Sequence, residues 1–132
     1  MFTRLKTRKA IAPALLLIFI TVGPLLLGAA EKPLTEKEKI EALIKHVEGL
    51  KDATFIRNDR DYNAKTAAQF LRRKWDANEK QIKTAADFID KAASVSSTTG
   101  KPYMIRFKDG REVKCGDYLK DELKKLDPTK TP

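Results

Sequence analysis

Apolar residues recur every three or four positions in several stretches of the chain, a spacing typical of helices that bury one face. The first such stretch begins at Thr35, which forms a capping-box sequence with Glu38. The spacing behind it predicts a helix over residues 36–50, with Gly49 as a stop signal near its end. The apolar stripe of this helix consists of Ile40, Leu43, Ile44, Val47 and Leu50.

Two more helices are predicted in the middle of the chain. Asn63 is a residue type that caps helix N-termini, and an apolar stripe follows it over residues 64–75. Another capping-box-like sequence starts at Thr84, and the helix behind it is expected to end at Ala93. The polar residues 76–83 between them are a connector or a continuation of the second helix.

Period-two alternation replaces the helical spacing in the last third of the chain. Residues 103–107 and 112–115 are predicted strands, and the Asp-Gly pair at 109–110 between them is a strong hairpin signal. Residues 54–58 have the composition of a short extended segment, and residues 58–61 that of a turn.

A fourth helix is predicted at the C-terminal end. Gly116 and Asp117 are expected to end the preceding strand and to cap this helix, and a frayed tail is expected over residues 126–132. Leu119, Leu123 and Leu126 share one face of the helix.

The predicted fold class is therefore α+β and mainly α: about four helices with a small β-hairpin packed on them. The hairpin needs this support because an isolated hairpin is marginally stable in water. Residues 55–56 are a candidate third short strand at its edge.

The N-terminal thirty residues have the pattern of a secretory signal peptide. A basic flank without acids precedes a short apolar run, and small residues at Gly28 and Ala30 suit cleavage after Ala30. We expect a signal peptide over residues 1–30 and a single small globular domain over residues 31–132, located in the periplasm or secreted. After cleavage no stable membrane span is expected. The alternative is an uncleaved N-terminal segment that anchors the protein to the inner membrane.

Removing this leader lowers the net charge of the protein. The whole chain carries a net charge of +9, and the leader holds four basic residues and no acid, which leaves +5. Basic blocks, zinc-ligand spacings and RNA-binding aromatic motifs are absent from the sequence, so we expect no nucleic-acid partner.

The cysteine and histidine content excludes two further kinds of site. Cys115 is the single cysteine, so no internal disulfide is expected in an exported protein. One cysteine and one histidine, His46, do not make a transition-metal site. We expect no metal and no cofactor.

Four segments follow one another in the mature chain: Phe55-Ile56-Arg57-Asn58; Ala67-Ala68 with Leu71-Arg72 and Lys74; Thr84-Ala85 with Phe88-Ile89; and Ala93-Ser94, Ser96-Ser97 and Gly100-Lys101-Pro102-Tyr103. Together they resemble the YfeK-like family of small bacterial exported proteins, a domain of unknown function. The resemblance spans residues 34–126 and implies an envelope address in a Gram-negative bacterium, without implying an activity.

Candidate binding residues fall in a donor-rich set that includes a run of hydroxyl residues. If they converge, they suit a carboxylate or phosphate, and they favour a non-enzymatic binding module for an envelope protein or an anionic ligand. The alternative is that the arginines pair with Asp59, Asp61 or Asp87 and fix the turn. The candidates are Arg57, Asn58, Arg72, Lys74, Ser94, Ser96, Ser97, Lys101 and Tyr103.

An enzymatic alternative is a small envelope hydrolase or transferase that uses a serine of residues 94–99. Ser96 or Ser97 would need a base within hydrogen-bond reach, and the sequence contains no nucleophile-elbow or Ser-x-x-Lys motif. Loop hydroxyls also commonly satisfy backbone groups, here the last carbonyls of the third helix. We therefore assign no catalytic residue. A structural envelope component without a discrete site is a third possibility.

Overall fold

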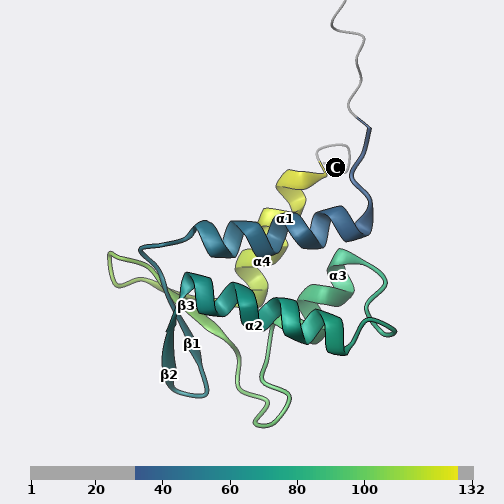
Figure 1. Cartoon of the computed structure of the whole chain (residues 1–132). Coiled ribbons are helices and arrows are strands. Elements are labelled where there is room, and N and C mark those ends of the chain that lie inside the picture. The colour runs from purple at the N-terminus through teal and green to yellow at the C-terminus, as the bar shows by residue number, and fades with distance from the viewer. Residues whose placement is uncertain (1–31, 128–132) are drawn as a thin grey trace, which may run out of the picture. The chain divides into compact units, whose positions relative to one another are not determined.

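The computed structural model describes residues 32–127, and all of these except Lys32 belong to one compact unit that begins at Pro33 (Figure 1). The predicted signal peptide, its cleavage site at Ala30 and the tail beyond Asp127 lie outside the described residues. Within residues 32–127, no helix combines the length and the apolar character that crossing a membrane requires.

Two long helices, α1 (Glu36–Gly49) and α2 (Ala64–Ala77), pack against each other (Figure 1). The predicted capping box of α1 is present: Thr35 Oγ1 accepts from the Glu38 N–H, and the Glu38 carboxylate accepts from the Thr35 N–H. Asn63 caps α2 as predicted, because its Oδ1 accepts from the Thr66 N–H at 2.8 Å. Local sequence therefore fixes both helix starts.

The third predicted helix is present but has two kinds of turn. It opens as α3 (Ala85–Phe88), with a capping box between Thr84 and Asp87, and continues as the π-helix η2 (Ile89–Ala93). The Ser94 Oγ donates to the Ile89 carbonyl at 2.7 Å, so this hydroxyl satisfies a carbonyl of the widened turn. Periodicity over so few residues does not distinguish a π turn from an α turn.

The β element is a four-stranded antiparallel sheet in the order β2-β1-β3-β4. The candidate third strand is confirmed as part of β1, and an additional strand, β2, lies at the edge. The predicted turn over residues 58–61 is wrong in extent: it comprises only Asn58 and Asp59, whose φ angles of 52° and 65° are left-handed, as hairpin turns of two residues require. The strands are β1 (Thr54–Arg57), β2 (Arg60–Asn63), β3 (Met104–Arg106) and β4 (Glu112–Lys114).

One face of the sheet covers the helices and forms part of the core. The cross-strand row Tyr62, Phe55, Ile105 and Val113 lies on this face, and Ile105 is fully buried. The helices contribute buried apolar side chains to the same core, among them Leu43, Val47, Phe88, Ile89 and Leu119.

The last helix, α4 (Cys115–Leu126), starts directly after β4, and the predicted break at Gly116 and Asp117 is wrong. Gly116 lies in the first turn of α4, which has no side-chain cap. A Cβ atom at Gly116 would collide with the Ser94 Oγ. The glycine therefore permits close packing of α4 on the segment after η2 rather than ending a strand.

Candidate functional site

The segment of residues 94–102, here called the hydroxyl loop, is fastened to the turn between β1 and β2 (Figure 1). The Thr99 Oγ1 donates to the Asn58 Oδ1 at 2.6 Å, and the Lys101 Nζ lies 2.6 Å from the Asp59 carboxylate. Asn58 and Lys101 are both candidates from the sequence. Asn58 of the turn binds the loop and Lys101 of the loop binds the turn, so both residues hold the loop in place.

Two serines of the hydroxyl loop form hydrogen bonds with backbone groups through their side chains. Ser96 is buried, and its Oγ accepts from the N–H groups of Thr98 and Thr99 at 3.3 and 3.4 Å. Ser94 contacts the Ile89 carbonyl of η2, as described above. Ser97 is the exception: it is exposed and lines the concave surface described below.

Arg57 extends from β1 toward α2 and lies over an aromatic ring. Its Cζ is 4.2 Å from the centroid of the Phe70 ring, a cation–π arrangement. Its Nε is buried and has no hydrogen-bond partner among the described residues. The expected acidic partners are engaged elsewhere: Asp59 with Lys101, and Asp61 with Arg106.

Lys74 and Tyr103 continue this arrangement toward the hydroxyl loop. The Lys74 Nζ donates to the Tyr103 Oη at 3.0 Å and to the Val95 carbonyl at 3.1 Å, and lies 5.0 Å from the centroid of the Tyr103 ring. The rings of Tyr103 and Phe70 meet edge to face at 5.9 Å. The cationic groups of Arg57 and Lys74 thus flank a pair of packed aromatic rings.

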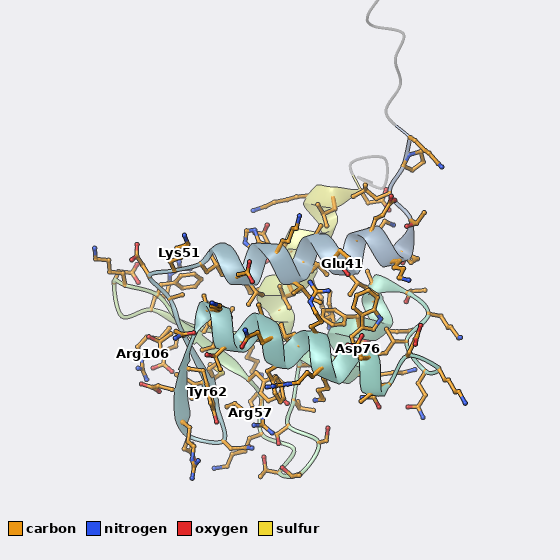
Figure 2. All side chains as sticks on the ribbon, viewed as in Figure 1. Glu41, Lys51, Arg57, Tyr62, Asp76 and Arg106 are labelled. Carbon is orange, nitrogen blue, oxygen red and sulfur yellow. The ribbon has the colours of Figure 1, made fainter. Side chains whose placement is uncertain are left out.

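Arg72, another candidate, lies outside this arrangement. Its two terminal nitrogens each donate to one carboxylate oxygen of Glu41 at 2.9 Å, which joins α2 to α1. Glu41 is labelled on α1 in Figure 2. This bidentate pair lowers the pKa of Glu41 below its ordinary value, chiefly through the hydrogen bonds from Arg72. The sequence prediction of Asp59, Asp61 or Asp87 as the partner is wrong, because the helix-helix packing brings Glu41 to Arg72.

Arg73, which sequence reasoning missed, belongs to the site. It is exposed, it borders the same concave surface as Arg57 and Lys74, and within the described chain no hydrogen bond or ion pair engages its side chain. A signal was available: Arg73 follows Phe70 by three positions on α2, and residues at that spacing share a helix face. Arg57, Arg73 and Lys74 are called the cationic rim below.

The cationic rim surrounds two adjoining concavities. The inner cavity, of about 120 Å³, lies between β1, β2 and α2 and is lined mainly by apolar and aromatic groups, including Phe55, Tyr62 and Leu71. The outer hollow, of about 460 Å³, is bordered by the rim and by Ser97 and Thr98. Arg57, Phe70, Arg73 and Tyr103 line both. Figure 2 shows Arg57 and Tyr62 together at this end of the molecule.

The lining of these concavities contains no carboxylate among the described residues. Three cations therefore lie beside an apolar interior without an acidic side chain in the described lining to neutralise them. Across residues 32–127, no group of three or more His, Cys, Asp or Glu residues is placed to hold a metal ion.

The remaining chemically reactive side chains, His46 and Cys115, are not part of the cationic rim. His46 Nε2 is 2.7 Å from the Tyr118 Oη, which joins α1 to α4. Cys115 begins α4 rather than ending a strand, and borders the inner cavity. Burial raises the pKa of its thiol to about 12, so the thiolate is disfavoured at neutral pH.

The fold and the site define a small α+β domain that carries a cationic rim above an apolar cavity. The chain belongs to the family of unknown function DUF5329, which matches residues 34–127. It is also 44% identical over 68 residues to the uncharacterized protein YfeK of Salmonella typhimurium. The match covers 52% of this chain and 57% of that protein, so the aligned region spans little more than half of either. No solved structure matches the chain. The predicted resemblance to a YfeK-like family is confirmed.

Proposed function

We propose that this protein is an exported, non-enzymatic binding module whose cationic rim takes an anionic ligand. The observation that carries the proposal is that Arg57, Arg73 and Lys74 meet at a concave surface to whose lining the described residues contribute no carboxylate. The N-terminal pattern of residues 1–30 supports an exported address.

The state of the rim donors suits recognition of an anion. The Phe70 ring supports the Arg57 guanidinium, so little conformational freedom is lost when a ligand binds there. Lys74 uses hydrogen bonds to Val95 and Tyr103 to hold a fixed position at the edge of the hollow. The exposed Ser97 adds a hydroxyl donor to the lining of the outer hollow.

The hydroxyl loop does not favour the enzymatic alternative. Ser94 and Ser96 make local hydrogen bonds that stabilise the loop and η2, and His46 is engaged with Tyr118 of α4. The Lys101 amine is paired with Asp59. A serine nucleophile needs a base that contacts it, and these pairings provide none.

A pair of adjacent arginines provides the test. Acetate and phosphate would each be titrated into the isotope-labelled protein recovered after export, at constant ionic strength, with amide NMR shifts as the readout. Arg73→Gln and Arg72→Gln remove the same charge, but only Arg73 belongs to the rim.

We expect saturable amide shifts of the rim residues. Arg73→Gln is expected to weaken the affinity for the anion about threefold or more, whereas the affinity of Arg72→Gln is expected to be close to that of the parent protein. Two outcomes would overturn the proposal. One is the absence of saturable shifts with either anion. The other is an equal loss in both variants, which would indicate general attraction by net charge.

A further inference from the structure

We infer that the anionic ligand carries an apolar tail that enters the inner cavity, which makes it a small amphipathic organic acid. The inference rests on the proposed function and adds the ligand class. It starts from the adjacency of the two concavities, whose linings share Arg57, Phe70, Arg73 and Tyr103.

The two concavities differ in chemistry. The outer hollow has the cations and hydroxyls, and the inner cavity has Phe55, Tyr62, Ala67 and Leu71 from two strands and α2. An inorganic anion such as phosphate uses only the outer hollow. A molecule with a charged head and an apolar tail fits both, with the head at the rim and the tail between the sheet and α2.

Arg57 lies at the boundary between these regions. Its guanidinium covers the Phe70 ring, and its buried Nε–H has no acceptor among the described residues. A buried donor without an acceptor is unfavourable. A carboxylate at this boundary supplies an acceptor to Arg57 while its carbon chain continues into the inner cavity, which defines the polarity of the bound ligand.

The volume of the inner cavity limits the tail. An apolar cavity of about 150 Å³ holds benzene, so a volume near 120 Å³ accommodates about five carbons. Each buried methylene is then worth about a fourfold gain in affinity. The gain is expected to end at about five carbons, because a longer chain has no further space.

The test is a titration series with straight-chain carboxylates from acetate to octanoate on the protein recovered after export, followed by NMR or calorimetry. We expect affinity to rise about fourfold per carbon up to pentanoate or hexanoate and then to level off. 1-Pentanol, which has the tail without the charge, is expected to bind at least tenfold more weakly than pentanoate.

Ala67 offers matched cavity variants because it lines the inner cavity from α2 and carries only a Cβ. Ala67→Val and Ala67→Leu add two and three carbons, and are expected to shorten the optimal tail by about as many carbons. Helical circular dichroism identifies which variants are folded, and Ala67→Val disturbs the packing less.

The outcomes separate this inference from the proposed function. Acetate binding at the rim with a flat dependence on tail length overturns the inference and leaves the proposed function standing. Tail-length gains that persist in both Ala67 variants also overturn it, since they would arise at another surface. The absence of binding by every carboxylate overturns the inference, and it overturns the proposed function as well only when phosphate also fails to bind.

Discussion

The Arg57 guanidinium lies over the Phe70 ring, with its Cζ 4.2 Å from the ring centroid. This relationship places a cation from β1 on an aromatic ring from α2, at the wall shared by the inner cavity and the outer hollow. A charge held in this way is oriented before a ligand arrives.

The first prediction concerns the shape of that cation. Arg57→Lys keeps the charge but loses the planar fork that matches a carboxylate. We expect the affinity for pentanoate, measured by calorimetry, to fall about tenfold, because this is the size of loss expected when a hydrogen bond to a charged group is removed. Arg72→Lys is the control, and its binding is expected to equal that of the parent protein. If the Arg57→Lys variant bound pentanoate as tightly as the parent protein, Arg57 would not contact the ligand.

The second prediction concerns the bidentate pair between Arg72 and Glu41. Both side chains are about two-fifths exposed, so we expect Arg72→Gln to lower the free energy of unfolding by less than about 1 kcal/mol at pH 7. The pKa of Glu41 is lowered in the folded state, so this contribution is present above the ordinary value of 4.5 and is lost as the pH falls through the folded value.

Urea unfolding of parent and variant between pH 2 and pH 7 measures this contribution. The two stability curves are expected to differ at neutral pH and to converge at the acid end. A difference that stays constant down to the lowest pH would show that Arg72 stabilises the fold through its packing and not through its pair with Glu41.

The third prediction concerns the close approach of Gly116 and Ser94. Gly116→Ala places a methyl group against the Ser94 side chain, and we expect a loss of about 1–3 kcal/mol in the free energy of unfolding, as overpacking typically causes. In a Ser94→Gly background the same change is expected to cost less, because its collision partner is gone. Urea unfolding of the four proteins in this double-mutant cycle measures the coupling. If the losses in free energy of unfolding caused by Gly116→Ala and by Ser94→Gly simply added, the proposed collision between the two side chains would be contradicted.

The fourth prediction concerns the N-terminal segment. Export is expected to remove residues 1–30, because Gly28 and Ala30 supply the small side chains before the cleavage site. Intact mass spectrometry of protein recovered from the periplasm should give a chain that begins at Glu31. A full-length mass in the membrane fraction would instead support the anchored alternative.

Local sequence predicted those parts of the fold whose determinants are themselves local. Thr35 with Glu38, Asn63, and Thr84 with Asp87 each cap a helix within four residues, so their helices begin where the sequence indicates. Strand β2 was missed because Arg60, Asp61 and Asn63 are exposed and give no apolar alternation. Its pairing with β1 depends on the left-handed turn at Asn58–Asp59.

The candidate site was predictable only in part, since charge and spacing do not say which partner a side chain meets. Arg72 and Arg73 are adjacent and have the same side chain. Packing of α1 on α2 brings Glu41 into contact with Arg72, whereas Arg73 lies at the rim. Likewise, Ser94 and Ser97 look alike in the sequence, whereas one satisfies η2 and the other faces the outer hollow.

We propose that the cationic rim and the inner cavity together bind one amphipathic anion. The most direct measurement is the set of intermolecular NOEs between pentanoate and the isotope-labelled protein. We expect contacts from the terminal methyl of pentanoate to the methyl groups of Ala67 and Leu71, and from the carbon beside the carboxylate to the Arg57 side chain. Contacts confined to another surface, or the reverse orientation with the methyl at the rim, would contradict the proposal.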